Sequence, residues 1–456
     1  MRLPDIKLVC MGVVAILLFL YLDGLGSSFM DYDEGAVYLY QNMLVAHGLK
    51  PYADFYYHQP FGLLFGFTDV LAARFVVFIF LMLGVMSVYY IGKQFGVGWF
   101  AVIFFLSSPM VMQFGRVFAT DLPSVAVFCM ALHAVVSKTE RKMLKIVLFG
   151  VSSALCIFMK IQMMIPIAII FLYLLVVQKD YDYAISFFIV VACFVLAIFR
   201  YPGFVNDAII GNMIGYDFSR AMVYMVTSVL IFSYKSLFMI PFVVLGAIEL
   251  FKRRKERSVM ALSVVLVAGV ATAFLYGWLN FKHFMFILPV IVVMAGVGLK
   301  KINSIPFTVA VLLCCVMVPI SEWKDTASND QYTRDIVMNI TLNTMVGDKI
   351  YTDQAVLAFL SNRTMPETAL MFNGMGRMHN LTATDVITDI KNEDPKLVIF
   401  VTQVYPDSME GPRISSTLGN NGSATVVSYL DGTYLYKTYA KRNWQILTIW
   451  SRSELK

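Results

Sequence analysis

Residues 74–92 read RFVVFIFLMLGVMSVYYIG, and this run decides the fold class. Apart from Arg74 at its start the run carries no charge, and its length approaches the roughly 20 residues that a helix needs to cross a bilayer. Backbone groups find no water inside the hydrocarbon layer, so such a run is expected to be helical. Similar apolar runs recur from Leu8 to Ile320, separated by short polar loops. The sequence therefore predicts an all-α polytopic membrane domain.

The composition of the 456-residue chain agrees with this prediction, because 59% of its residues are hydrophobic and only 14% are charged. Soluble domains carry roughly 25% charged residues. The net charge of +6 does not indicate a nucleic-acid partner, since the basic residues lie in short loops between apolar runs. We expect about eleven transmembrane helices, near residues 8–28, 74–92, 97–115, 120–137, 144–159, 161–177, 184–200, 221–250, 258–278, 284–299 and 304–320.

The distribution of lysine and arginine predicts the orientation, because cytoplasmic loops carry an excess of these residues. With a cytoplasmic N-terminus, every inner loop is basic: these loops hold Lys93, Lys138, Arg141, Lys142, Lys145, Lys179, Lys252, Arg253, Arg254, Lys255, Arg257, Lys300 and Lys301. We therefore expect a multi-pass protein of the cell membrane. A transmembrane domain over 1–320 includes a large outer loop at 29–73, and a soluble extracytoplasmic domain follows at 321–456.

The C-terminal 321–456 segment is predicted to be a small α/β domain. Thr382 and Asp385 have the spacing of a capping box at the start of a helix, with Asp in place of the usual Glu or Gln. Four N-x-S/T sequons, at Asn339, Asn362, Asn380 and Asn421, agree with an outer location. The predicted elements are strands at Lys349–Thr352, Leu397–Thr402, Thr425–Tyr429 and Tyr434–Thr438, and helices at Gln354–Leu360 and from Thr382.

The first outer loop holds a cluster of carboxylates, with Asp31, Asp33 and Glu34 at the mouth of the first span. Such a cluster can simply face water and favour the N-terminus of the next helix. The functional interpretation is that one carboxylate acts as a general base and takes a proton from an acceptor hydroxyl or amine.

Four further charged residues lie near predicted outer helix ends. Arg116 and Asp121 flank the start of a span, where the simplest interpretation is a structural ion pair. Lys160 interrupts an apolar run, so it must reach the interface, pair with an acid or bind an anion such as a lipid phosphate. Lys282 opens the tenth span and has an equally simple interpretation as an interfacial anchor.

The order of these motifs resembles the dolichyl-phosphate-mannose–protein mannosyltransferase superfamily, which includes the lipid A aminoarabinose transferases. The resemblance covers roughly residues 1–300. It is carried by Asp33-Glu34, a Tyr-rich stretch, Gly48-Leu49-Lys50-Pro51-Tyr52-Ala53-Asp54, His58-Gln59-Pro60, Ala73-Arg74, Arg116 to Asp121, Gly150 to Lys160, and His283-Phe284 with Pro289.

This resemblance implies a membrane glycosyltransferase of the C-type (GT-C) fold that takes its sugar from a polyprenyl-phosphate donor. Asp33 matches the catalytic carboxylate, with Glu34 beside it, and Asp121 matches a second acidic position. Relatives often have Lys between the His and Pro, where this chain has Gln59, so Lys160 or Arg74 is expected to contact the phosphate instead. The remaining expected contacts to carrier phosphate or substrate are Arg116, His58, Tyr52, Lys282 and His283.

The expected reaction inverts the anomeric carbon, because the acceptor attacks opposite the leaving phosphate. The acceptor is left open as a protein, lipid or glycan, and neither a cofactor nor a metal is required. A divalent ion held by Asp33, Glu34 and His58 remains an alternative. An oligosaccharyltransferase is disfavoured because the tail lacks Trp-Trp-Asp. The competing non-enzyme class is a polytopic transporter or binding protein with an outer sensor domain.

Overall fold

The structure is a computed structural model, and it describes residues 3–26, 34–55, 57, 59–210, 226, 230, 234, 237–275, 281–326, 331–366, 369, 382–404, 415–434, 436–442 and 445–452. Its contacts divide the chain into two compact units. The first, the helical unit, comprises Met1–Gly26, Gln59–Leu63 and Leu71–Asp325. The second, the mixed unit, comprises Ser27–His58, Leu64–Val70 and Thr326–Lys456.

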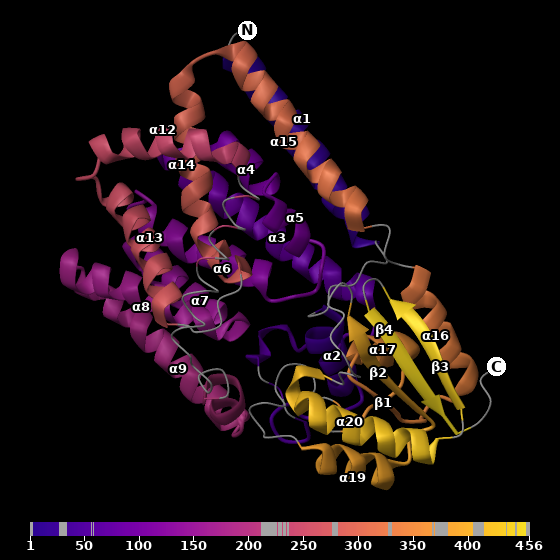
Figure 1. The fold of residues 1–456 in the computed structure, drawn as a ribbon. Coiled ribbons are helices and arrows are strands. Elements are labelled where there is room, and N and C mark those ends of the chain that lie inside the picture. The colour runs from indigo at the N-terminus through magenta and orange to yellow at the C-terminus, as the bar shows by residue number, and fades with distance from the viewer. Residues whose placement is uncertain are drawn as a thin grey trace. The chain divides into compact units, whose positions relative to one another are not determined.

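Long apolar helices build the helical unit (Figure 1). Within the described part of the chain, five helical segments are long and apolar enough to cross a membrane: Ile6–Leu25, Val70–Gln94, Lys142–Met159, Tyr181–Arg200 and Met285–Ile302. Four shorter apolar helices accompany them, at Asp121–Val136, Ile161–Val177, Arg257–Thr272 and Ile305–Val318. These helices support a multi-pass membrane protein; the count of about eleven spans stays a prediction.

The helices of this unit have the following bounds: α1 (Leu3–Leu25), α3 (Val70–Gln94), α4 (Gly98–Leu106), α5 (Pro109–Phe114), α6 (Asp121–Val136), α7 (Lys142–Met159), α8 (Met164–Leu172), α9 (Ala184–Arg200), α12 (Ile240–Lys252), α13 (Arg257–Leu275), α14 (Leu288–Ile302) and α15 (Ile305–Thr326). Short 3₁₀ or π turns lie among them: η2 (Phe61–Leu63), η3 (Ile161–Met163), η4 (Tyr173–Val177), η5 (Tyr181–Tyr183), η6 (Val205–Ile210), η7 (Leu237–Met239) and η8 (Phe281–Ile287).

The stretch predicted as one span at 97–115 is divided into α4 and α5. Ser108 is extended, with φ −63° and ψ 126°, and Pro109 follows it as the first residue of α5. A residue before proline is disfavoured in the helical region, which explains the break. In the span predicted at 221–250, residues 221–225, 227–229, 231–233 and 235–236 lie outside the described residues, whereas the last part forms η7 and α12.

Glycines allow two of the helices to pack in close contact. A Cβ atom at Gly246 in α12 would lie 1.8 Å from the carbonyl oxygen of Met294 in α14, and one at Gly298 would lie 2.0 Å from that of Phe242. No side chain fits at these two positions. Small residues of this kind let helix backbones approach where the surrounding lipid supplies no hydrophobic driving force.

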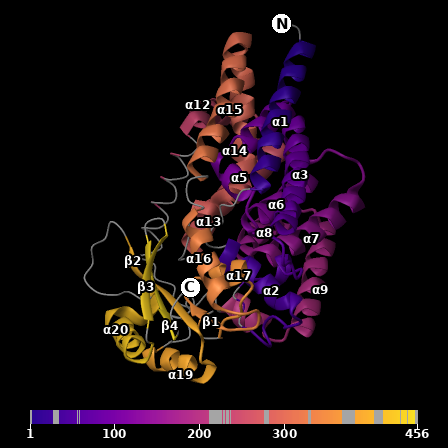
Figure 2. The same ribbon diagram turned by 90° about the vertical axis from the view of Figure 1, so that its right-hand side faces the viewer.

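The mixed unit contains a four-stranded sheet of order β1-β2-β4-β3. β1 (Ile350–Thr352) pairs in parallel with β2 (Leu397–Val404), and β4 (Gln445–Ser451) pairs antiparallel with β2 and with β3 (Tyr436–Arg442). Both views show the sheet between two helix pairs (Figures 1 and 2). One pair is α16 (Gln331–Asn343) with α17 (Ala355–Ser361), and the other is α19 (Ala383–Glu393) with α20 (Ser415–Thr433).

Of two features predicted for the C-terminal segment, the capping box and the strand at Thr425–Tyr429, the structure confirms the first and contradicts the second. The capping box is confirmed, because the Thr382 hydroxyl accepts from the Asp385 backbone N–H and the Asp385 carboxylate accepts from that of Thr382. The strand predicted at Thr425–Tyr429 is wrong, because these residues lie in α20. Val426 and Leu430 are fully buried at helical i, i+4 spacing, so packing against α19 overrides the strand preference of the valines.

Most of the segment predicted as the first outer loop shares the mixed unit with the C-terminal segment, whereas Gln59–Leu63 belong to the helical unit. It forms a π-helical turn, η1 (Glu34–Leu39), that continues into α2 (Tyr40–Ala46). The buried Tyr40 hydroxyl accepts a hydrogen bond from the backbone N–H of Met365, at 2.7 Å. The side-chain oxygen of Asn42 accepts from the backbone N–H groups of Phe65 and Gly66, at 2.8 and 2.9 Å. The loop is thus held by specific side-chain contacts.

Candidate active site

The centre of the candidate site is a buried salt bridge between two neighbouring helices. Asp121 is the first residue of α6, and Lys160 follows directly after α7. The Lys160 ammonium donates to an Asp121 carboxylate oxygen, and the two side chains are only 8% and 2% exposed. Removing two charges from water is costly, so the deep burial of this ion pair indicates a specific structural or functional role.

A local break in the helix places Lys160 at this position. Its backbone is extended, with φ −153° and ψ 112°, and the chain resumes in η3 and α8. The side chain therefore leaves the end of α7 instead of continuing along the helix surface. Broken helices at membrane depth occur where backbone lines a cavity or is buried within protein.

One turn into the helices, Cys156 and Ser124 align α7 with α6. The Cys156 thiol donates to the Ser124 carbonyl oxygen, at 3.2 Å, and the Ser124 hydroxyl donates to the Asp121 carbonyl oxygen, at 2.8 Å. The small residues Ser152 and Ser153 are buried on the same helix. This polar contact keeps the two helix ends in register, so that Asp121 and Lys160 meet.

An aromatic cluster lies beside the Lys160 break. The Phe61 ring lies 5.0 Å from that of Phe158, 4.8 Å from that of Tyr201 and 5.5 Å from that of Phe204. Gly62 packs directly on the end of α7, since a Cβ there would lie 2.5 Å from the Phe158 carbonyl oxygen. The first-loop turn η2 is therefore fitted against the helix end that carries Lys160.

Two predicted phosphate-binding arginines lie at the C-terminal end of α1. Arg74 is 1% exposed, and its guanidinium donates to the Leu25 carbonyl oxygen at 3.1 Å. Arg116 is 3% exposed and packs on Gly24, where a Cβ would lie 3.2 Å from its Cδ. Cations are favoured at the negative end of a helix dipole, which gives both arginines a structural role as well.

Buried charged side chains gather at one end of the helical unit. Among the described residues of this unit they are Arg74, Arg116, Lys160 and Asp121. All four lie at the end of the unit where α1 and α7 finish and α3 and α6 begin. Ionisable residues buried among membrane helices are costly and commonly mark substrate or ion sites.

The predicted residues of the first loop belong to the mixed unit. Glu34 is fully buried at the start of the π-helical turn. Tyr52 is 9% exposed, and its ring lies 5.8 Å from that of Tyr57. Its φ of +63° is unusual for a residue with a bulky side chain, and backbone strain of this kind clusters at functional sites. Asp33 and His58 lie outside the described residues.

The remaining predicted positions are at the start of α14. Lys282 is partly buried in η8, whereas the side chain of His283 lies outside the described residues. η8 packs against α6, the helix that begins with Asp121. No group of three or more His, Cys, Asp or Glu able to hold a metal ion occurs in the described part of the chain.

Sequence reasoning missed several residues that shape this site. Phe61 and Gly62 directly follow the quoted His58-Gln59-Pro60 motif, but only the fold shows that they pack on α7. Gln162 lies two residues beyond Lys160 and is 9% exposed, and its side-chain oxygen has no hydrogen-bond partner among the described residues. A buried acceptor in this state costs about 1–3 kcal/mol and is suited to a polar ligand.

Comparison with known proteins gives the same picture. The family model of dolichyl-phosphate-mannose-protein mannosyltransferase matches residues 50–203. No curated protein matches the chain. ArnT from Cupriavidus metallidurans superposes in its apo state with a TM-score of 0.70 at 13% identity, covering 98% of both chains.

Two further solved structures share the fold. ArnT bound to undecaprenyl phosphate superposes with a TM-score of 0.69 at 14% identity over 98% of both chains. The oligosaccharyltransferase of Archaeoglobus fulgidus superposes with a TM-score of 0.54 at 12% identity, over 86% of this chain and 69% of that one. The resemblance inferred from the sequence is confirmed: the chain has the fold of the GT-C membrane glycosyltransferases and, over residues 50–203, the sequence features of the mannosyltransferase family model.

Proposed function

We propose that the chain is a membrane glycosyltransferase that moves a sugar from a polyprenyl-phosphate donor to a protein, lipid or glycan acceptor on the extracytoplasmic face. The observation that carries this proposal is the buried Asp121–Lys160 pair at a helix break, at the same end of the helical unit as the buried Arg74 and Arg116. A phosphate attached to a lipid would be attracted to these cations, and its polyprenyl chain would remain among apolar helices. The solved complex of ArnT with undecaprenyl phosphate, which has the same fold, supports this choice of donor.

The buried cations have a chemical task in this proposal. Negative charge builds on the carrier phosphate as the bond from the sugar to the phosphate breaks, and preorganised cations stabilise that charge. Lys160 holds the phosphate, and Arg116 adds positive charge close to the end of α1. Asp121 orients Lys160 through their buried ion pair. The free acceptor oxygen of Gln162 is suited to receive a hydrogen bond from a sugar hydroxyl.

Asp33 is the proposed general base. It removes a proton from the acceptor nucleophile, which attacks the anomeric carbon from the side opposite the phosphate and inverts the configuration. Glu34 is buried in an adjacent π-helical turn, a local geometry that is frequent at functional sites. Tyr52, His58, Lys282 and His283 are proposed to contact substrate, and Arg74 to support the α1 end.

The test uses membranes that contain wild type, Asp33→Asn or the control Asp31→Asn, which removes the same charge two residues away. Each is given a panel of radiolabelled polyprenyl-phosphate sugars, and label is followed into lipid, glycan and protein fractions. Removing a general base lowers the rate by about 100- to 10,000-fold. We expect that loss for Asp33→Asn and near wild-type transfer for Asp31→Asn, with the labelled fraction identifying the acceptor.

Two outcomes would contradict the proposal. Full activity in Asp33→Asn would exclude Asp33 as the base. Absence of transfer by wild type with every donor, combined with saturable uptake or binding of a solute, would favour the competing transporter or sensor function.

A further inference from the structure

A pocket with polar and apolar walls lies at the end of the helical unit opposite the candidate active site. It has a volume of about 320 Å³ and lies between the first turns of α1, the α3–α4 turn and the α14–α15 turn. Lys7 in its wall precedes Leu25 by 18 residues, which corresponds to roughly 27 Å along the axis of α1. The pocket is therefore separate from the Asp121–Lys160 site.

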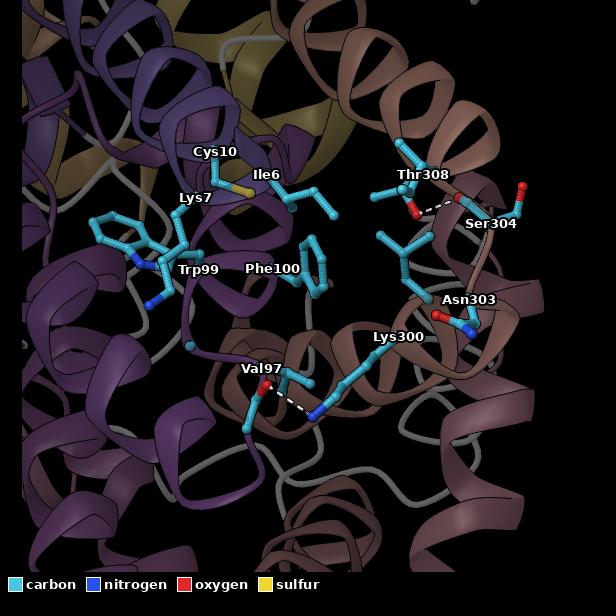
Figure 3. Close-up of a pocket in the computed structure, with 14 residues that line it drawn as sticks. Ile6, Lys7, Cys10, Val97, Trp99, Phe100, Lys300, Asn303, Ser304 and Thr308 are labelled. Carbon is cyan, nitrogen blue, oxygen red and sulfur yellow. Dashed lines mark hydrogen bonds between the residues drawn. The ribbon is translucent and has the colours of Figure 1, made fainter. Parts of the chain in front are cut away.

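The lining of this pocket is amphipathic (Figure 3). Lys7 and Trp99 lie on one side, Asn303 and Ser304 on the other, and Ile6 and Phe100 lie between them. Tryptophan is typical of the membrane–water interface, where its ring is apolar and its N–H is polar. A molecule with a charged headgroup joined to hydrocarbon chains would match both the polar and the apolar parts of this lining.

Two lysines give the pocket its charge. Lys300 donates only a long hydrogen bond, of 3.4 Å, to the Gly96 carbonyl oxygen, which is also visible in Figure 3. Neither Lys7 nor Lys300 forms a salt bridge with an acidic residue among the side chains that the structure describes. In contrast, nearby Lys252 lies 2.7 Å from a Glu249 carboxylate oxygen. The pocket lysines are thus available to an anion.

The surfaces next to the pocket are suited to acyl chains. Leu8 and Met11 on α1 are 72% and 51% exposed, and Phe307 and Leu313 on α15 are 43% and 61% exposed. Both helices begin at the pocket and run away from it. A free inorganic anion would use only the lysines, whereas a lipid would use the lysines and these apolar faces together.

We propose that this pocket binds the phosphate-bearing headgroup of an anionic membrane phospholipid. Lys7 and Lys300 contact the phosphate, Asn303 and Ser304 offer hydrogen bonds to its polar substituent, and the acyl chains follow α1 and α15. Basic pockets between transmembrane helices are a recurring means of recognising anionic lipids. This binding is independent of the transfer reaction proposed above.

The experiment measures phospholipid binding to the full chain in detergent by native mass spectrometry. The probes are phosphatidylglycerol, phosphatidylcholine with the same acyl chains, and inorganic phosphate as a competitor. The test variant is Lys7→Gln with Lys300→Gln. The control variant, Lys93→Gln with Lys255→Gln, removes the same charge from exposed lysines outside the pocket.

We expect wild type to retain one phosphatidylglycerol in preference to phosphatidylcholine. Each lysine at a membrane surface contributes about fivefold in affinity, so the test variant should bind about 30-fold more weakly. The control variant should bind as wild type does. Equal binding by wild type and the test variant, equal losses in both variants, or displacement of the lipid by millimolar inorganic phosphate would overturn the proposal.

Discussion

The buried salt bridge offers a test that separates structural from functional roles. Replacing Lys160 with Met removes the cation and leaves the Asp121 carboxylate, which is 2% exposed, without its ammonium. Breaking a buried ion pair by removing one partner typically costs about 3–5 kcal/mol, because a charge remains in an apolar environment. The double variant, Asp121→Asn with Lys160→Met, removes both charges and is expected to recover most of that loss.

Transfer activity should follow a different pattern. If Lys160 contacts the carrier phosphate, its loss removes a stabilising cation from the transition state, and one such interaction is worth about 100- to 1,000-fold in rate. Removing Asp121 as well cannot restore it. We therefore expect the double variant to be folded and stable but at least about 100-fold slower than wild type.

The assay combines thermal unfolding in detergent with transfer of labelled sugar by the same preparations. Lys142→Met serves as the control, because it removes a half-exposed cation that pairs with Asp180 and Asp182 at the other end of α7. Asp180 keeps Arg257 as a partner there, so the exchange should have little effect. Recovery of both stability and activity in the double variant would refute the phosphate-binding role. It would leave the pair a purely structural contact.

Two further predictions follow from local geometry. Gly62→Ala introduces a Cβ that would lie 2.5 Å from a backbone carbonyl oxygen of α7, so we expect a loss of about 1–3 kcal/mol in stability and slower transfer, whereas Gly12→Ala, with open space around its Cβ position, should be neutral. Asp431 is subject to burial, which raises its pKa, but hydrogen bonds from Trp450 and Lys437 hold that pKa below its ordinary value of 3.8. Its contribution to stability is therefore present above pH 3.8 and lost as the pH falls through the lower, folded-state pKa. Far-UV circular dichroism during acid titration should show Asp431→Asn with a weaker dependence on pH in that range, and an unchanged titration would contradict the assignment.

The features that could be read from the sequence are those that depend on local chemistry. Long apolar runs such as 74–92 predict helices because a bilayer leaves the backbone no other partner. The Thr382–Asp385 spacing predicts a helix start because capping involves residues close in the chain. The same local reasoning failed at Thr425–Tyr429, where valines favour a strand in isolation but Val426 packs with Leu430 on one face of α20.

The sequence by itself predicted a polytopic helical protein with a GT-C fold, and it marked Asp121 and Lys160 as candidate site residues. Only the tertiary structure decided that these two form one buried pair, that Arg74 and Arg116 gather at the end of α1, and that Gly62 packs on α7. The physical reason is the separation along the chain over which each interaction acts. Hydrophobic length and capping act between chain neighbours, whereas a salt bridge between residues 39 positions apart exists only after α6 and α7 have packed.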